Sequence, residues 1–252
     1  YTIIRLPKII EYGEGRTKTL HDYNEFLTEQ GKFQANGFNL EADDFEENGL
    51  REVDGNQISV FPASFTDKYE DITRGPQTVS RKDIGHIITK TGITKDSDVL
   101  DAGAGSGALA LYLSRIASTV TTMDIDEDNV DIVKENKASL DIENLNVEHG
   151  DITDDAQVQP DEYDVVTLDI PDPWEALPTA QKALRIGGYA AFYTPHISQA
   201  QQIIKEAPQS LHHDETVEVT ATSWDVGEKR LRPSTHGVNH TGFLTFLRCI
   251  DK

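Results

Sequence analysis

VLDAGAGSGA, residues 99–108, runs from a short apolar segment into three glycines at alternate positions. Apolar residues at helical spacing follow it, from Leu109 to Ile116. This order predicts a strand, a tight glycine turn and a helix, because glycine accepts positive φ and leaves the backbone bare for a ligand. The helix start then offers unpaired N–H groups to a polar ligand. The spacing G-x-G-x-G differs from the G-x-G-x-x-G of dinucleotide folds, so a packing turn without a ligand is the alternative interpretation.

Acidic residues follow the next two predicted strands. Residues 120–125 form an apolar strand pattern, and Asp124 lies about 20 residues after the glycine turn, where a carboxylate can accept both ribose hydroxyls. Asp151 follows a short strand at residues 145–149. The carboxyl ends of parallel strands meet at one crevice, so the glycine turn and both acids predict a nucleoside site. The alternative is that each acid caps the helix after it.

Strands and helices alternate from residue 99 onward, and this alternation predicts a parallel sheet with helices on both faces. Two final strands without a helix between them predict an antiparallel pair at one edge. The fold class is therefore α/β, with a Rossmann-like sheet. The predicted helices cover residues 128–140, 174–184 and 197–207; the later strands cover 163–170, 189–194, 216–224 and 242–250. The glycine pair at 187–188 is expected to end the second of these helices.

The N-terminal part of the chain has a different pattern. Short apolar segments alternate with glycine turns, and Asp54-Gly55 before an apolar run predicts a hairpin. Residues 21–30 are compatible with one or two helical turns. The chain is therefore predicted to contain a small β-rich domain at residues 1–68, a linker and first helix at 69–98, and a catalytic domain at 99–252.

The charge balance is strongly acidic, with 23 Lys and Arg against 44 Asp and Glu and a net charge of −21. The acids are scattered along the chain, which indicates a solvated surface and not an acidic tail. Such a surface fits a salt-rich cytoplasm, where screening removes self-repulsion. Net charge argues against nucleic-acid binding at low salt, but at high salt recognition depends on shape, stacking and local basic residues.

The single cysteine, Cys249, excludes an intramolecular disulfide and a cysteine-based metal cluster, and no metal centre is expected. The sequence shows no signal peptide and no apolar run near 20 residues. A cytoplasmic protein without a membrane partner is therefore expected.

A second unusual segment, DIPDPW at residues 169–174, closes the strand that begins near residue 163. Its two prolines restrict the backbone to a stiff, extended loop. Such a loop presents Asp169 and Trp174 beside the crevice, where ionised Asp169 accepts hydrogen bonds only and can orient an exocyclic amine. The alternative is a prolyl turn that caps a helix, with Trp174 in the core.

Four segments, taken together, resemble the tRNA adenine-N1 methyltransferases, which are class I S-adenosylmethionine-dependent enzymes. These segments are RGPQ at 74–77, KD at 82–83, the glycine turn and DIPDPW. The segment from Arg232-Pro233 to Leu244 is also similar. This family modifies adenosine 58 in the T-loop of tRNA, and archaeal relatives modify adenosine 57 as well. The resemblance implies S-adenosylmethionine as cofactor, tRNA as partner and a homotetramer.

The resemblance assigns catalysis to Asp169. It implies that the cofactor is bound by Val79, Gly103, Gly105, Ser106, Gly107, Asp124, Asp151, Ile152 and Asp169. Candidate substrate-binding residues are Arg74, Gln77, Ser80, Trp174, Arg232 and His240. Arg74 either contacts a phosphate or balances neighbouring acids, and Arg232 and His240 either contact phosphate or form subunit contacts. Ser80 stands where the family has an aromatic or histidine ring near the target base.

Two other functions remain open at this point. A protein L-isoaspartate O-methyltransferase shares the sheet but gives no reason for the DIPDPW segment. A non-catalytic tRNA-binding subunit would explain the serine at position 80, but such subunits lose the cofactor glycines and acids that this chain keeps.

The acidic surface makes a prediction about salt. We expect the melting temperature to rise between low and molar KCl by at least about 5 °C, the equivalent of ~2 kcal/mol, because screening weakens repulsion among surface carboxylates. Thermal unfolding followed by circular dichroism at a series of KCl concentrations measures the shift. Equal stability at both extremes would contradict the salt-adapted interpretation.

Overall fold

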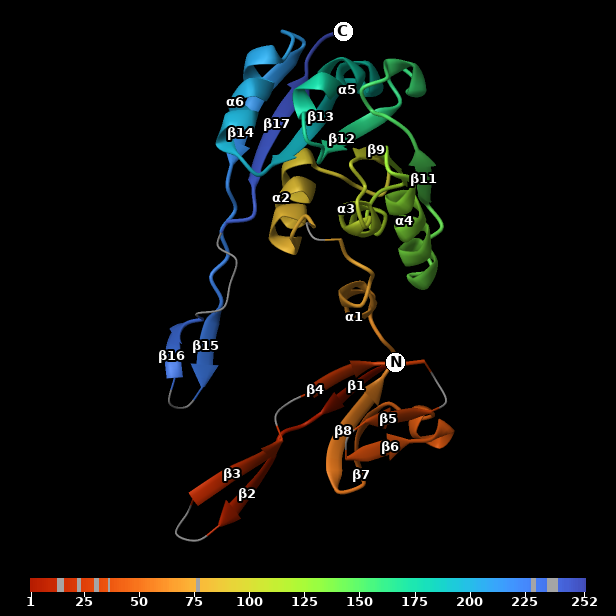
Figure 1. Ribbon diagram of the computed structural model, residues 1–252, viewed down its shortest axis with the longest axis vertical. Coiled ribbons are helices and arrows are strands. Elements are labelled where there is room, and N and C mark those ends of the chain that lie inside the picture. Colours follow the sequence, from red (N-terminus) through yellow and green to blue (C-terminus); the bar gives the residue numbers. More distant parts are fainter. Residues whose placement is uncertain are drawn as a thin grey trace. The chain divides into compact units, whose positions relative to one another are not determined.

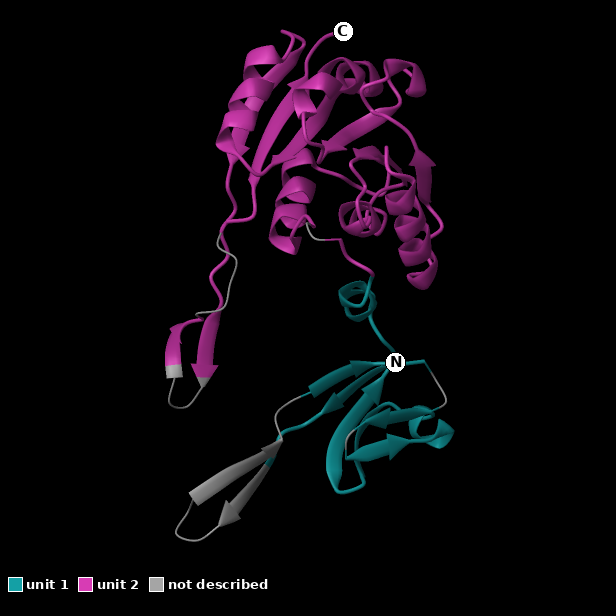
Figure 2. Cartoon of the chain, in the orientation of Figure 1, with its two compact units in different colours: residues 1–72 teal, residues 73–252 magenta. Residues whose placement is uncertain are grey.

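Short strands make up the first part of the chain and alternating strands and helices the rest, in the computed structural model shown in Figure 1. The structure describes residues 1–12, 16–21, 24–29, 32–35, 37–75, 78–227, 230–234 and 240–252. The chain divides into two compact units, residues 1–72 and 73–252 (Figure 2). None of the helices in the described ranges has the length and apolar character needed to cross a bilayer.

The first unit is built on a four-stranded antiparallel sheet of order β4-β1-β8-β7. Its small core consists of Ile3, Phe38, Leu40, Phe45, Ile58 and Val60. The elements are β1 (Thr2–Arg5), β2 (Lys8–Tyr12), β3 (Arg16–His21), β4 (Asn24–Leu27), β5 (Phe33–Ala35), β6 (Phe38–Leu40), the 3-10 helix η1 (Ala42–Phe45), β7 (Gly49–Val53), β8 (Asn56–Phe61) and α1 (Phe65–Glu70).

Two local predictions in this unit have opposite outcomes. The Asp54-Gly55 hairpin is confirmed: both residues have positive φ, and Val53 pairs with Asn56 across the turn. The helical turn expected within residues 21–30 is wrong, because residues 24–27 form β4, which pairs with β1. Tertiary packing explains the difference, since the Phe26 ring on β4 lies against the rings of Phe33 and Phe38.

The second unit contains a seven-stranded sheet of order β11-β10-β9-β12-β13-β17-β14. The first five strands are parallel and β17 runs antiparallel to both of its neighbours. The predicted Rossmann-like sheet with antiparallel strands at one side is confirmed. The elements are α2 (Arg81–Thr91), β9 (Asp98–Ala102), α3 (Ala108–Leu113), β10 (Thr119–Asp124), α4 (Glu127–Ser139), β11 (Leu145–His149), η2 (Asp155–Gln157), β12 (Tyr163–Leu168), η3 (Pro173–Ala176), α5 (Leu177–Ala183), β13 (Leu184–Thr194), α6 (Ile197–Glu206), β14 (Leu211–Val217), β15 (Trp224–Gly227), β16 (Arg230–Pro233) and β17 (Phe243–Cys249).

Helices cover both faces of this sheet. On one face, Leu177 and Ala180 of α5 and Ile203 of α6 join a buried cluster with Leu100 and Phe192 of the sheet. On the other face, the ring of His86 in α2 contacts Phe246 of β17. Phe246 pairs with Ala191, the neighbour of Phe192, and successive side chains of a strand point to opposite faces.

The strand order places a ligand crevice between β9 and β12. From β9 the chain continues to β10 and β11 on one side, and then crosses to β12 and β13 on the other. Open α/β sheets bind ligands outside the carboxyl ends of the strands at such a reversal of strand order. The glycine turn follows β9 and the DIPDPW segment follows β12, so both of the unusual sequence segments lie at this crevice.

Two predicted elements in this unit need correction. The strand expected at 216–224 lies instead at residues 211–217, as β14. It ends there because its partner β17 begins at Phe243, and Val217, opposite Leu244, is the last residue of β14 that pairs with it. The glycine pair expected to end a helix lies inside β13, since α5 already ends at Ala183. Gly187 has a φ of +91°, which allows an irregularity where β13 pairs with β12.

Candidate active site

The glycine turn between β9 and α3 is fastened to the neighbouring strand β10. The N–H groups of Gly103 and Ala104 both donate to the carbonyl oxygen of Met123, at 3.1 and 3.2 Å. Gly107 N–H donates to the Ala104 carbonyl oxygen at 2.7 Å. The φ angles of Gly103, Gly105 and Gly107 are +83°, +52° and +79°. Residues with a Cβ rarely adopt such angles, so the turn requires its glycines.

Close packing adds a second requirement at two of the three glycines. A Cβ on Gly103 would lie 2.0 Å from the carbonyl oxygen of Asp169, and a Cβ on Gly107 would lie 2.9 Å from Cγ1 of Val133. A Cβ on Gly105 would meet no atom within 4 Å. Gly103 and Gly107 are therefore required for packing, whereas the backbone at Gly105 is open to a ligand.

Asp124, at the end of β10, supports the glycine turn from the side. Its Oδ2 accepts a hydrogen bond from the Gly105 N–H at 2.9 Å, and its Oδ1 accepts one from the Asp126 N–H at 3.0 Å. A carboxylate oxygen has more than one acceptor site, so these bonds leave capacity for a ligand hydroxyl. The same side chain can therefore hold the turn and contact a ligand.

A cavity of about 750 Å³ opens at the carboxyl ends of β9, β10, β11 and β12. A pocket of about 30 Å³ shares part of its lining. Together the two cavities are lined by most of the predicted cofactor-binding residues: Val79, Gly103, Gly105, Ser106, Asp124, Asp151, Ile152 and Asp169. Gly107 lines neither cavity and instead caps the start of α3.

Ser106 provides an unpaired polar atom in the smaller pocket. Its side chain is buried, and its Oγ has no hydrogen-bond partner among the described residues. A buried hydroxyl without a partner costs free energy, and a ligand atom in the pocket would remove that cost. This atom, the bare backbone at Gly105 and the carboxylates of Asp124 and Asp151 fit a cofactor that carries a ribose and a charged amino-acid end.

Asp169 lines both cavities from the tip of β12. Its N–H donates to the carbonyl oxygen of Ala102 at 2.9 Å, which fixes the backbone against β9. Burial, and to a smaller extent the nearby negative charge of Asp101, raise the pKa of the Asp169 carboxyl to about 7. The site thus holds a carboxyl group that changes charge near neutral pH.

Asp101 lies beneath this site and is only 2% exposed. Its two carboxyl oxygens accept hydrogen bonds from Thr122 Oγ1 at 2.7 Å and from Thr167 Oγ1 at 2.6 Å. Burial raises the pKa of Asp101, and the two threonine hydroxyls oppose this shift. Asp101 therefore connects β9 to both neighbouring strands and influences Asp169 through its charge.

The loop after Asp169 is held by prolines and by α6. Gln199 Nε2 donates to the carbonyl oxygen of Pro171 at 3.0 Å, and Pro173 begins the short helix η3. Trp174 is half-buried and packs against the core cluster below the loop. The structure thus places Trp174 with the core and not among the residues that line the cavities.

The other predicted substrate residues that the structure describes do not line these two cavities. Ser80 precedes α2 and donates through Oγ to Asp83 at 2.8 Å. Arg232 on β16 forms an ion pair with Asp225 at 3.7 Å, and His240 pairs with Glu218. Arg74 is exposed at the start of the second unit, and Gln77 lies outside the described residues.

Several lining residues were not predicted as site residues. Thr78 precedes α2, and the others come from the strand tips and the segments after them: Asp101, Met123, Asn129, Asp172, Glu175, Pro195 and Gln199. Asp101 lies inside the segment VLDAGAGSGA, and Asp172 lies inside DIPDPW. Pro195 and Gln199 follow the carboxyl end of β13, and this position is the sequence signal that would have found them.

Comparison with known proteins gives consistent results. A family model described as tRNA methyltransferase complex GCD14 subunit matches residues 71–242. The chain is 28% identical over 230 residues to the tRNA (adenine(57)-N(1)/adenine(58)-N(1))-methyltransferase TrmI of Methanocaldococcus jannaschii, covering 79% of this chain and 81% of that protein. It is 27% identical over 199 residues to the tRNA (adenine(58)-N(1))-methyltransferase TrmI of Thermus thermophilus, covering 77% and 78%.

Solved structures agree on the fold. A tRNA (m1A58) methyltransferase TrmI from Aquifex aeolicus matches with a TM-score of 0.76 and 23% identity, over 100% of this chain and 97% of that one. An S-adenosylmethionine-dependent O-methyltransferase from Thermotoga maritima matches with a TM-score of 0.77 and 22% identity, over 100% and 93%. These two matches show only the fold, because two enzymes with different titles match this chain about equally well in TM-score and identity.

The contact between Gly103 and Asp169 makes a prediction. Gly103→Ala should lower the affinity for S-adenosylmethionine at least tenfold and lower the melting temperature, because the new methyl group would force the tips of β9 and β12 apart. Isothermal titration calorimetry and thermal unfolding measure the two effects.

Gly85 supplies a matched control. It lies within α2, and a Cβ there would meet no atom within 4 Å. Gly85→Ala should leave cofactor affinity unchanged and stabilise the protein by about 0.5–1 kcal/mol, since alanine is the better helix former. If Gly103→Ala behaved like Gly85→Ala, the close approach of the two strand tips would not be required.

Proposed function

The chain belongs to the tRNA methyltransferase complex GCD14 subunit family, and from this premise we propose that it transfers a methyl group from S-adenosylmethionine to N1 of adenosine in tRNA. The proposal rests on one observation above all. Asp169, from the DIPDPW segment, lines the same cavity as the glycine turn and the carboxylates of Asp124 and Asp151. The resemblance of the sequence motifs to the tRNA adenine-N1 methyltransferases is confirmed by the family match.

The residues around the cavity fit S-adenosylmethionine. Asp124 and Asp151 offer acceptors for ribose hydroxyls or a charged amino group, and Ser106 Oγ offers the hydrogen bond that it lacks. The bare backbone at Gly105 lets a ligand approach closely. When bound there, S-adenosylmethionine supplies an electrophilic methyl group on a positively charged sulfur.

Asp169 is the residue assigned to catalysis. Adenine N1 carries a lone pair at neutral pH, so no base has to remove a proton before the methyl group is attacked. The protein's contribution is then positioning and electrostatic stabilisation. The ionised carboxylate of Asp169 accepts a hydrogen bond from the N6–H of adenine, which orients N1, and its charge stabilises the cationic base that forms.

The target base must leave its stack to reach this carboxylate. Extruding a nucleotide costs a few kcal/mol, by analogy with enzymes that flip bases. The stiff prolyl loop and its hydrogen bond to Gln199 keep Asp169 in place without the base, so the protein does not lose further conformational entropy when the base arrives.

The raised pKa of Asp169 gives the reaction a pH dependence. A carboxyl with a pKa of about 7 is mostly protonated below pH 7 and mostly ionised above it. The protonated form presents a donor where N6–H needs an acceptor. The rate is therefore expected to rise with pH through the neutral range.

We predict that kcat/KM for tRNA increases between pH 6 and pH 8 with a midpoint near 7. Asp169→Ala and Asp169→Asn should lower methyl transfer by roughly 10²–10³-fold and remove this pH dependence, with cofactor affinity largely kept. Transfer of labelled methyl groups to tRNA, with calorimetric titration of cofactor, measures both. Normal turnover of either variant would remove Asp169 from the mechanism.

The same assay separates the alternatives. An isoaspartyl peptide offered in place of tRNA tests the protein L-isoaspartate O-methyltransferase, and a protein that binds tRNA but transfers no methyl group would be a non-catalytic subunit. Neither alternative is favoured by a described feature of the site. Mapping the modified nucleotide decides between adenosine 58 alone and adenosines 57 and 58, which are the positions named for the relatives from Thermus thermophilus and Methanocaldococcus jannaschii.

We also propose that the protein is a homotetramer, as the family resemblance implies. The hairpin of β15 and β16 supports this. Val226 pairs with Leu231, and Trp224 lies two residues before Val226, so all three side chains share one face. They are 76%, 77% and 56% exposed, and a two-stranded hairpin has little stability of its own in water. A second copy of the chain would bury this face.

The double variant Val226→Asp, Leu231→Asp should therefore lower the molar mass in solution, as measured by light scattering after gel filtration. Leu50→Asp, at another exposed apolar position with 61% exposure, serves as the control and should leave the mass unchanged. A wild-type chain that ran as a monomer would contradict the assembly directly.

The cellular setting is also a proposal, which rests on charge and on similarity to relatives. A net charge of −21 and a similarity to an archaeal enzyme support a salt-adapted, archaeal protein. A tRNA substrate supports a place in the cytoplasm.

A further inference from the structure

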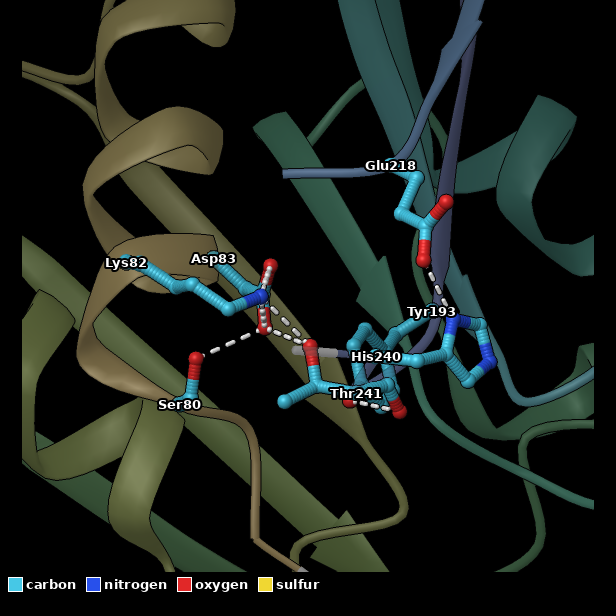
Figure 3. Close-up of polar contacts among 7 residues, drawn as sticks. All are labelled: Ser80, Lys82, Asp83, Tyr193, Glu218, His240 and Thr241. Atoms are coloured by element: carbon cyan, nitrogen blue, oxygen red, sulfur yellow. Dashed lines mark hydrogen bonds and ion pairs between the residues drawn. The ribbon is translucent and has the colours of Figure 1, made fainter. Parts of the chain in front are cut away.

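A fully buried carboxylate lies in the first turn of α2. Asp83 has no exposed surface, and its Oδ2 accepts hydrogen bonds from Ser80 Oγ at 2.8 Å and from Thr241 Oγ1 at 2.7 Å. The ammonium group of Lys82 lies 2.9 Å from Oδ1 and 3.1 Å from Oδ2. Figure 3 shows these groups converging between α2 and the segment that precedes β17.

The cluster is closed by a further bond. Lys82 Nζ donates to Thr241 Oγ1 at 2.6 Å, so this hydroxyl accepts from the lysine and donates to the aspartate. The side chain of Lys82 is only 15% exposed. Two opposite charges are thus paired almost without water, and removal of either one would leave the other buried and unpaired.

Thr241 belongs to an excursion of the chain. After β14 the chain leaves the sheet and forms the paired strands β15 and β16, and residues 240–242 lead back into β17. We call Glu218 together with residues 240–242 the neck of this excursion. Its two sides are joined by the pair of Glu218 and His240, and its return side is fixed to Asp83 through Thr241.

The neck is also bonded to the carboxyl end of β13. Tyr193 Oη donates to the carbonyl oxygen of Thr241 at 2.6 Å (Figure 3), and His240 Nε2 lies 3.3 Å from the carbonyl oxygen of Pro195. A Cβ on Gly242 would lie 2.7 Å from Cζ of Tyr193. The tyrosine ring therefore packs directly on the backbone of the neck.

Tyr193 lies beside the catalytic position. Leu168 of β12 pairs with Phe192 of β13, so Asp169 and Tyr193 come next at the two strand tips. The pKa of Tyr193 is raised, first by burial and also by the negative charges of Asp83 and Asp169. Hydrogen bonds thus lead from Asp83 through Thr241 to Tyr193, and Tyr193 lies on the strand beside the one that ends at Asp169.

We propose that Asp83 is a positioning residue, which through Thr241 holds the neck and the Tyr193 ring in register with Asp169 so that bound tRNA delivers its adenine to the carboxylate. This inference rests on the proposed function. The neck carries the hairpin with Arg232, and an RNA held there reaches the site accurately only if the neck is fixed. A misplacement of about 1 Å at a reacting group can lower a rate by roughly 10²-fold.

The contact is suited to this task because it is directional. An apolar contact would bury the neck as well, but it would permit sliding along the helix. Thr241 Oγ1 accepts a hydrogen bond from Lys82 and donates one to Asp83. Because hydrogen bonds depend on direction, a shifted neck would lose both of them.

Thr241→Val tests the proposal with little change in volume. It should lower kcat/KM for tRNA roughly ten- to hundredfold, while the affinity for S-adenosylmethionine changes less than about threefold. Thr241→Ser keeps the hydroxyl and should restore most of the activity. Asp83→Asn should act in the same direction as Thr241→Val, and the valine variant decides the matter if the asparagine variant does not fold.

A matched control lies at the other end of α2. Lys90 Nζ is 3.1 Å from Asp214 and 3.0 Å from Glu215 on β14, so this pair also fastens the helix to the sheet, but away from the strand tips. Asp214→Asn should lower the melting temperature by an amount similar to Thr241→Val, or less, and leave kcat/KM for tRNA unchanged.

The outcomes distinguish this inference from the proposed function. If wild-type protein methylates tRNA and Thr241→Val does so equally well, Asp83 does not position the substrate. The same conclusion follows if Asp214→Asn loses activity in proportion to its stability, as Thr241→Val does. A wild-type protein that neither binds nor methylates tRNA would overturn the proposed function, and this inference with it.

Discussion

The active site depends on the contact between two strand tips. Gly103 lies so close to the carbonyl oxygen of Asp169 that no side chain fits between them, and the Asp169 N–H is bonded to Ala102. This contact places the glycine turn and the prolyl loop side by side at the edge of one cavity. Glycine at position 103 is therefore required twice, by its positive φ and by the approach of β12.

The same closeness creates the electrostatics of the site. Burial raises the pKa of both Asp101 and Asp169, and the negative charge of Asp101 acts in the same direction on the pKa of Asp169. Asp101 is stabilised by two threonine hydroxyls, whereas the Asp169 carboxyl faces the cavity. The folded protein bears this unfavourable electrostatic energy at the position proposed for catalysis, which fits the rule that strained groups gather at functional sites.

Much of the site could be predicted from the sequence because its residues follow strands. Gly105, Asp151 and Asp169 come just after a strand and Asp124 ends one, and parallel strands bring such positions together. The orientation of Trp174 could not be predicted, since a proline-rich loop does not show to which side its ring turns. The Asp83–Thr241 bond joins positions 158 residues apart, and no local pattern shows that the two side chains meet. The predicted strand at 216–224 fails for a similar reason, because the length of β14 is set by its partner β17.

The acidic surface changes what tRNA recognition requires of the fold. With a net charge of −21, the protein gains little from general attraction to phosphate. Affinity must then come from shape, stacking and a few local contacts, which are short-ranged and tolerate little displacement. A protein with a broad basic surface can hold RNA loosely and let it adjust. This chain must instead hold its own contact surfaces still, and a buried, directional bond such as that between Asp83 and Thr241 meets that demand better than a mobile ion pair at the surface.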